Sequence, residues 1–130
     1  MASSFYTVES KLSAADAAKR LQEAVLKEKY GVIDVLNLKQ IMAGKGVTYD
    51  DEAIVVSVCE PNYARKFLTL ENTVASCLPC RISVTSRKGK TYISLPLPSA
   101  MFGLFSNGEL AKAGAETEAA LKRMVDAARA

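Results

Sequence analysis

AIVVSVCEP, at residues 53–61, is the most strand-like stretch of this 130-residue chain. Its run of β-branched side chains predicts a strand over Ala53–Cys59, and the high valine content is typical of a central strand that is buried on both faces. Pro61 has no backbone N–H for a strand ladder, but it fits the first turn of a helix. A helix is therefore expected over Pro61–Leu70, with its inward face formed by Ala64, Phe67 and Leu68.

Two further strands and a long helix are predicted downstream. Arg81–Ser86 alternates apolar and polar side chains, Gly89 supplies the positive φ of a tight turn, and Thr91–Leu95 returns as the partner strand. Residues 109–128 carry a helical stripe made of Leu110, Ala113, Thr117, Leu121, Met124 and Val125. Gly114 inside this helix costs about 1 kcal/mol relative to alanine, which is too little to overrule the period.

The residues upstream predict a strand, a helix, a second strand and a short helical segment. Phe5–Glu9 has the alternation of a short strand, and Ser13 is expected at the N-cap of the first helix. The buried face of that helix is predicted to contain Ala14, Ala17, Ala18, Leu21, Val25 and Leu26. Gly31 is expected to end the helix in the left-handed conformation. A strand over Val32–Leu36 and a short helix or turn over Leu38–Ala43 follow.

These elements define the fold class. Their order is β-α-β-(short α)-β-α-β-β-α, which lacks the strict βαβ alternation of a parallel sheet. We therefore expect an α+β fold with a largely antiparallel sheet and with helices packed on one face. A chain of 130 residues is long enough for one core, so residues 1–130 are expected to form a single domain.

The composition excludes several classes of function. The chain has no histidine, which rules out Ser-His-Asp and Cys-His catalytic arrangements and histidine zinc motifs. Its net charge is +3, and residues 81–108 contain four basic and no acidic side chains. That basic footprint is small for nucleic acid, so we expect no nucleic-acid partner. The N-terminus lacks the features of a signal peptide, and no apolar run approaches the ~20 residues of a membrane span. A cytoplasmic protein with no membrane partner is expected.

The three cysteines are the candidates for chemistry. Cys77-Leu78-Pro79-Cys80 is similar in spacing to a thioredoxin redox motif, but it precedes a strand, where there is no helix dipole to lower a thiol pKa. Three thiolates lack the fourth ligand of a structural zinc site, which an Asp, a Glu or a partner chain would have to supply, so no metal and no cofactor are expected. Cys59 could be a small buried residue, or a functional thiol beside the free amides of the following helix. We expect Cys59 and Cys80 to approach each other, because the strands that they bound are expected to be neighbours in the sheet or to flank one another at one end.

Around these cysteines the sequence resembles the DUF302 family, small bacterial and archaeal domains of unassigned function. The resemblance rests on Cys59-Glu60-Pro61-Asn62-Tyr63-Ala64, then Leu68, and on Leu78-Pro79-Cys80. It extends to the first helix, to residues 31–36 and to the stretch around Met101 and Asn107, and so spans nearly the whole chain. Two positions depart from the family pattern, because Glu60 replaces a common Asn or Lys and Leu97 replaces a common acidic residue.

The resemblance implies an α+β fold similar to that of the TATA-binding protein, and a homodimer, but no reaction. We hypothesise a non-enzymatic dimeric module that binds a small ligand or a protein partner. The alternative is a thiol protein that acts in sulfur transfer or redox exchange through Cys59 and Cys80. The candidate thiol or ligand site consists of Cys59, Glu60, Pro61, Cys80 and Arg81, with Cys77 in a secondary place.

The segment SAMFGLF, residues 99–105, has no helical or strand period. Its apolar side chains could form a lid over the core, a dimer contact or a loop that touches a membrane. An exposed apolar patch of this kind would mark an interface.

Overall fold

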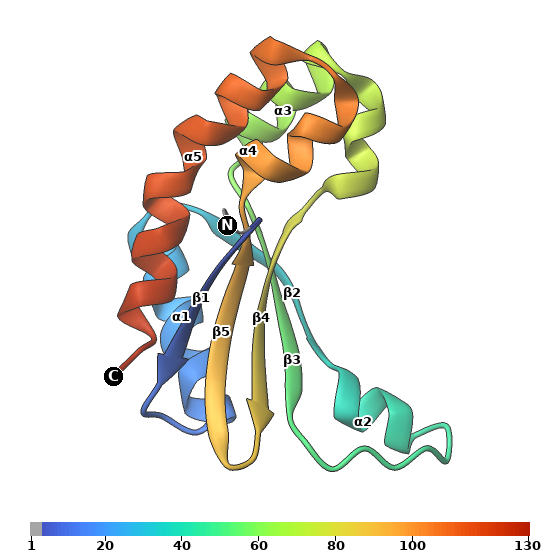
Figure 1. Ribbon diagram of the computed structural model, residues 1–130, viewed down its shortest axis with the longest axis vertical. Helices are drawn as coiled ribbons and strands as arrows, with labels where there is room; N and C mark the ends of the chain where they lie inside the picture. The colour runs from blue at the N-terminus through green and yellow to red at the C-terminus, as the bar shows by residue number, and fades with distance from the viewer. Residues whose placement is uncertain (1–3) are drawn as a thin grey trace.

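A five-stranded antiparallel sheet forms the centre of the molecule (Figure 1). The computed structural model describes residues 4–130. The strand order is β1-β5-β4-β3-β2, and every neighbouring pair is antiparallel. The strands are β1 (Phe5–Ser10), β2 (Gly31–Asn37), β3 (Ala53–Cys59), β4 (Cys80–Arg87) and β5 (Lys90–Pro96). The expected α+β class is confirmed.

The helices follow the strands in the expected order, with additional short helical segments. The α-helices are α1 (Ala14–Lys27), α2 (Leu38–Ala43), α3 (Pro61–Leu70), α4 (Pro98–Met101) and α5 (Gly108–Ala127). The 3₁₀ segments are η1 (Asn72–Cys77) and η2 (Phe102–Phe105). No helix in this described part of the chain is long and apolar enough to cross a membrane.

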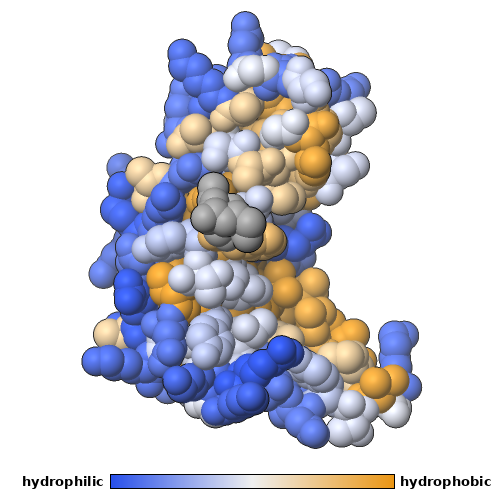
Figure 2. Space-filling view, viewed as in Figure 1, coloured by the Kyte–Doolittle hydropathy of each residue, from blue (hydrophilic) through white to orange (hydrophobic). Residues whose placement is uncertain are grey.

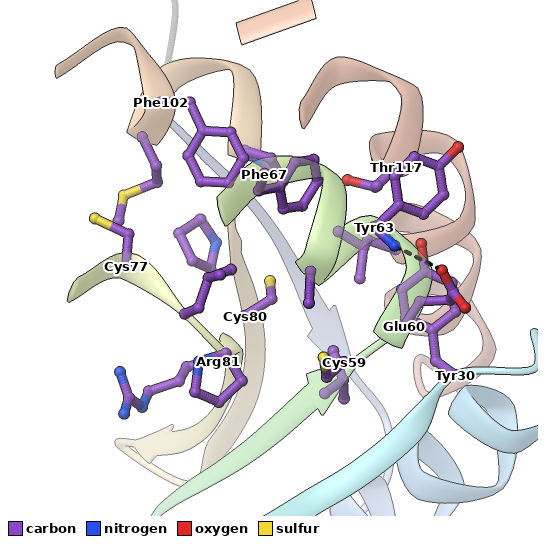
Figure 3. A pocket seen from close by; sticks show the side chains of 18 of the residues that line it. Tyr30, Cys59, Glu60, Tyr63, Phe67, Cys77, Cys80, Arg81, Phe102 and Thr117 are labelled. Carbon is purple, nitrogen blue, oxygen red and sulfur yellow. Dashed lines mark hydrogen bonds between the residues drawn. The ribbon is translucent and has the colours of Figure 1, made fainter. Parts of the chain in front are cut away.

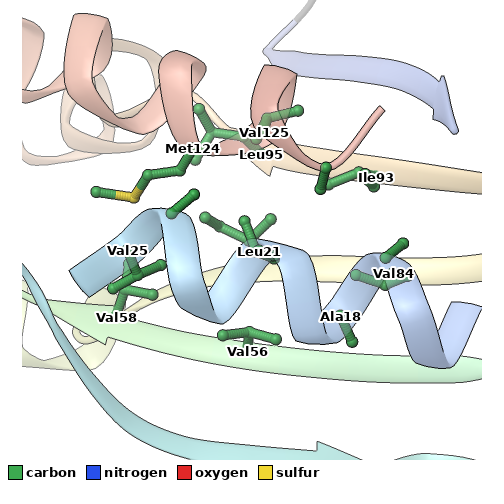
Figure 4. Packing of buried hydrophobic residues seen from close by; sticks show 14 of the residues in the cluster. Ala18, Leu21, Val25, Val56, Val58, Val84, Ile93, Leu95, Met124 and Val125 are labelled. Atoms are coloured by element: carbon green, nitrogen blue, oxygen red, sulfur yellow. The ribbon is translucent and has the colours of Figure 1, made fainter. Parts of the chain in front are cut away.

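One face of the sheet is covered by α1 and by the C-terminal half of α5 (Figures 1 and 4). Leu21 and Val25 of α1 and Met124 of α5 are fully buried against it. The sheet contributes the alternate side chains of each strand, among them Val56, Val58, Ile82, Val84, Ile93 and Leu95. Since side chains alternate along a strand, this pattern leaves the other face to the residues in between.

The other face of the sheet has no helix on it and is mostly polar. The strand register places Thr7, Ser94 and Ser83 in one row across β1, β5 and β4. The hydroxyls of Thr7 and Ser94 are hydrogen bonded at 3.0 Å. Figure 2 shows this polar surface as the pale region in the centre of the molecule. A polar open face is typical of an antiparallel sheet covered on one side only.

The segments α3, η1, α4, η2 and the start of α5 form a separate layer beyond the end of the sheet, here called the helical cap (Figure 1). The cap has its own apolar cluster, which consists of Phe67, Val74, Phe102, Leu110 and Ala113. Asn107 ties the cap together, because its side-chain oxygen accepts from the Leu110 amide at 3.1 Å and its amide nitrogen donates to the Leu70 carbonyl at 3.1 Å. α5 joins the cap to the core, since one end packs in each cluster.

The segment 99–105 covers the cap cluster rather than forming one exposed patch. Phe102 is buried, and Met101 and Phe105 are partly buried against the same cluster. Leu104 is the exception at 77% exposure. The segment therefore contributes mainly to the interior of the cap.

Four details of the sequence interpretation were wrong. The left-handed residue after α1 is Lys29, with φ 63°, and Gly31 instead begins β2. Leu26 and Leu68, expected to face inward, are 64% and 39% exposed. Each follows a buried residue, Val25 or Phe67, and successive residues of a helix are rotated by about 100°. β3 is an interior strand paired with β2 and β4, but it is not buried on both faces throughout: helices cover only one face of the sheet, so Val55 on the open side is partly buried, although Ser57 on that side is buried.

Candidate functional site

A cavity of about 200 Å³ lies between the end of the sheet and the helical cap (Figure 3). Residues at the end of β3, at the start of β4 and on α3 and α5 line it. The lining is mainly apolar and aromatic. The lining includes Tyr30, Val58, Cys59, Tyr63, Ala64, Phe67, Cys77, Leu78, Cys80, Met101, Phe102, Thr117 and Leu121. A mainly apolar pocket with few polar groups is the usual form of a small-molecule site.

The sequence Cys59-Glu60-Pro61 builds the turn from β3 into α3. Glu60 occupies the N-cap position of α3, and its carboxylate accepts from the Tyr63 amide at 2.9 Å and from the Asn62 side chain at 3.1 Å. Pro61 takes the first helical position, where its missing N–H costs nothing. These hydrogen bonds, led by the one from Tyr63, lower the pKa of Glu60. Glu60 is thus an ionised helix cap at the rim of the cavity.

Cys59 and Cys80 lie at the same end of the sheet. Val58 of β3 is the register partner of Cys80 of β4, so Cys59 is one residue from the direct partner of Cys80. Cys80 packs on the apolar core together with Val58. Because side chains alternate along a strand, Cys59 is directed to the other side of β3 from Val58. Both cysteines line the cavity because it extends around the end of the sheet, and all three cysteines are free thiols.

The surroundings of these two thiols favour the protonated form. Burial raises the pKa of Cys80 to about 12, and the nearby Cys59 adds to the effect. Burial also raises the pKa of Cys59, with a further contribution from the Glu60 carboxylate. An apolar environment penalises the charged thiolate. Neither thiol has the lowered pKa that marks a nucleophilic cysteine.

Two of the predicted site residues have a different position in the site from the one expected. Cys77, secondary in the sequence interpretation, lies on the wall of the same cavity, on the side opposite Tyr30 and Tyr63 (Figure 3). Arg81 is on the rim and exposed, and its guanidinium points away from the other labelled residues (Figure 3).

The sequence interpretation missed several lining residues, chiefly Tyr30, Met101, Phe102, Thr117 and Leu121. They come from three distant parts of the chain. The apolar stripe of the last helix predicted that Thr117 and Leu121 are buried. It does not show whether a buried residue packs in the core or lines a cavity. Burial raises the pKa of Tyr30 to about 12, which agrees with its position inside the cavity.

The cysteines do not form a metal centre with acidic side chains. Within residues 4–130 no group of three or more cysteine, aspartate or glutamate side chains is placed to hold a metal ion. The arrangement is that of an apolar cavity with neutral thiols in its wall.

Alkylation rates should reflect the raised thiol pKa values. At pH 7.4 Cys59 is expected to react with iodoacetamide more slowly than a free thiol, and Cys80 more slowly still. Both rates should rise as the pH increases above 9, because the thiolate is the reacting form. Glu60→Asn removes the smaller cause of the raised Cys59 pKa, so this variant should react modestly faster at Cys59 than the wild type does. Peptide mapping by mass spectrometry separates the sites. Fast labelling of Cys80 at neutral pH would contradict this account.

The fold and the cavity define a small α+β domain with a built-in pocket at the end of an antiparallel sheet. The family model described as "Domain of unknown function DUF302" matches residues 6–128, so the chain belongs to the DUF302 family. The crystal structure of an uncharacterized conserved DUF302 protein from Bacillus stearothermophilus is similar, with a TM-score of 0.93 and 26% identity. The match covers 98% of this chain and 100% of that one. A comparison with curated proteins found no match.

Proposed function

We propose that this protein is a non-enzymatic binding module that holds a small, uncharged and mainly apolar molecule in the cavity beneath the helical cap. The single observation behind the proposal is the cavity itself. Its volume of about 200 Å³ exceeds that of an engineered cavity of ~150 Å³ that binds benzene. A molecule with a single ring or with two fused rings fits this space.

The chemistry of the lining favours a neutral ligand. The Glu60 carboxylate is occupied by the amides of α3, and Arg81 points outward, so no free charge is available to pair with an ionic ligand inside. Phe67 and Phe102 offer aromatic edges and faces, with their ring centroids 4.9 Å apart. Sulfur contacts from the thiols and from Met101 suit a polarisable ring.

Sulfur transfer or redox exchange through Cys59 and Cys80 is the weaker alternative. Either reaction needs a thiolate near neutral pH, and the pKa of both thiols is raised. Their positions in the cavity wall fit contact with a bound ligand.

Titration with indole, followed by amide NMR, tests the proposal. We expect saturable shifts of the Cys59, Tyr63 and Cys80 signals, and weaker binding of indole-3-acetate, because its carboxylate would lose its hydration without gaining a partner. Ala64→Leu puts three extra carbons into the cavity and should weaken indole binding at least about tenfold. Ala75→Leu, on the exposed side of η1, is the matched control. Equal binding by the two variants, or no shift at these residues, would refute a ligand site here.

The module is proposed to act as a homodimer through β2 and α2. Along this edge of the sheet lie large apolar side chains that are exposed, namely Ile33, Val35, Leu36, Leu38, Ile41 and Val47. Figure 2 shows this surface along the lower part of the concave side. A monomer seldom exposes so continuous an apolar surface. The β-bulge between Val32 and Asp34 disturbs the edge of β2, so side-chain packing is favoured over strand-to-strand pairing.

The charge variant Ile33→Glu should therefore give a monomer. Ile33 is 58% exposed, so the substitution disturbs little within one protomer but places a carboxylate in the proposed interface. Light scattering should report about twice 14.0 kDa for the wild type and 14.0 kDa for the variant. Leu26→Glu on α1 is the control, because Leu26 is exposed to 64% and lies outside the β2–α2 surface. A wild-type protein that is monomeric at micromolar concentration would overturn the dimer.

A further inference from the structure

A second groove lies on the helix-free face of the sheet, at the end of the β4–β5 hairpin. It has a volume of about 590 Å³ and is lined by Thr7, Tyr49, Thr85, Ser86, Arg87, Lys88, Lys90, Tyr92 and Ser94. The lining contains three cationic side chains, two tyrosines and four aliphatic hydroxyls, and no carboxylate. This composition is the reverse of the apolar cavity under the cap.

The hairpin holds two of the cations against each other. Lys88 and Gly89 have φ 53° and 77°, which form the tight two-residue turn of a hairpin. As a result Arg87 and Lys90 are direct register partners and project to the same face. Like charges directly opposite on paired strands repel each other and destabilise the pair. Neither side chain forms a salt bridge within residues 4–130. An anion held between them would remove this repulsion.

The groove continues from the cations over uncharged groups. Tyr92 and Thr85 are register partners in the next row, and Ser94 follows in the row beyond, bonded to Thr7 at 3.0 Å. Tyr49 reaches the groove from the loop before β3. Within residues 4–130 the hydroxyls of Tyr49 and Tyr92 make no hydrogen bond, so both are free to contact a ligand. Two acidic residues adjoin the lining. Glu9 is the β1 partner of Tyr92, and Glu52 is joined to Ser86 by backbone contacts and pairs its own carboxylate with Lys39 at 3.7 Å.

We propose that this groove binds a phosphate monoester attached to a small ring-bearing body, such as a sugar phosphate or a nucleotide. A phosphate monoester carries −1.5 to −2 charges at pH 7, which matches three cations at one end. Arg87 presents a planar fork suited to two phosphate oxygens. The tyrosine rings and hydroxyls then face the uncharged body. The footprint of three cations is small for duplex nucleic acid.

Titration of the full chain with adenosine 5′-monophosphate, ribose 5-phosphate and inorganic phosphate tests the proposal, with sodium chloride matching the ionic strength. We expect amide shifts confined to the hairpin and its neighbours for the two organic phosphates. Inorganic phosphate should bind more weakly, because it cannot reach the tyrosines, and uncharged adenosine should not bind. Raising the salt should weaken binding, since the contacts are exposed.

Matched variants locate the site. Arg87→Gln with Lys90→Gln should weaken nucleotide binding at least about tenfold, because each hydrogen bond to a charged group is worth this much or more. Tyr49→Ala tests the ring contact separately and should also weaken binding. Lys19→Gln with Lys112→Gln removes two cations elsewhere and should change nothing. Glu9→Gln should strengthen binding by removing the neighbouring negative charge.

Three results would overturn the proposal. The first is that sodium chloride alone, at equal ionic strength, causes the same amide shifts as the organic phosphates. The second is that the control variant, Lys19→Gln with Lys112→Gln, weakens nucleotide binding as much as Arg87→Gln with Lys90→Gln. The third is that a single-stranded oligonucleotide binds far more tightly than the mononucleotide, which would indicate a surface that binds extended polyanions. Each result leaves the indole experiment unaffected, because the two sites share no lining residue.

Discussion

Phe102→Ala is expected to lower the free energy of unfolding by about 3–5 kcal/mol, the usual cost of removing a buried aromatic side chain. Phe102 is 3% exposed and lies edge-to-face against Phe67, with their ring centroids 4.9 Å apart. It fills the centre of the cap cluster and also forms part of the cavity wall. The substitution therefore removes packing that holds the cap together and widens the proposed ligand site.

Leu104→Ala is the matched control, because Leu104 belongs to the same short segment but is 77% exposed. Its effect should stay within about 0.5 kcal/mol. Urea unfolding followed by circular dichroism measures both variants, at one fixed protein concentration because a dimer's stability depends on it. Similar effects for the two variants would show that residues 99–105 do not form the interior of the cap.

Gly114→Ala is expected to lower the free energy of unfolding by about 1–3 kcal/mol, the usual cost of overpacking. Alanine would gain about 1 kcal/mol of helix propensity in an unconstrained helix. At Gly114, however, an added Cβ would lie 2.6 Å from Cδ2 of Phe102 and 3.2 Å from Cβ of Pro98. The Phe102 ring already packs edge-to-face against Phe67, which limits how far it can move away. We therefore expect the steric cost of the added methyl group to exceed the gain in helix propensity.

Gly108→Ala in the first turn of the same helix provides the comparison. A Cβ at Gly108 meets nothing within 4 Å, so this variant should be neutral or slightly stabilising. Combining Gly114→Ala with Phe102→Leu should cost less than the sum of the two single variants, because the smaller side chain leaves room for the methyl group. Additive costs would mean that Phe102 is not the obstacle.

The local elements could be predicted from the sequence because their signals are local. Ser13 accepts from the Asp16 amide at 3.1 Å as the N-cap of α1, as its position indicated. Gly89 has the positive φ that the hairpin turn requires. The apolar stripe of the last helix, from Leu110 to Val125, is buried as its spacing predicts. In each case a few neighbouring residues contain the whole physical cause.

The two sites depended on contacts between distant segments, which local patterns do not contain. Tyr30, Cys59, Cys80 and Phe102 meet in one cavity only because the sheet ends where the helical cap begins. The groove likewise joins Thr7, Tyr49 and the hairpin cations across three parts of the chain.

The cysteine motif was visible in the sequence, but the chemistry of its thiols was not. A residue pattern suggested that helix amides could activate Cys59. The folded chain instead places the Glu60 carboxylate on those amides and buries both thiols, which raises their pKa values. By itself the sequence determined the five strands, the longer helices, the α+β class and the position of the motif, because these depend on neighbouring residues; it did not predict the short helical segments η1, α4 and η2 of the cap. The cavity, the groove and the state of the thiols were decided by the tertiary structure, because burial and charge proximity exist only once distant segments pack together.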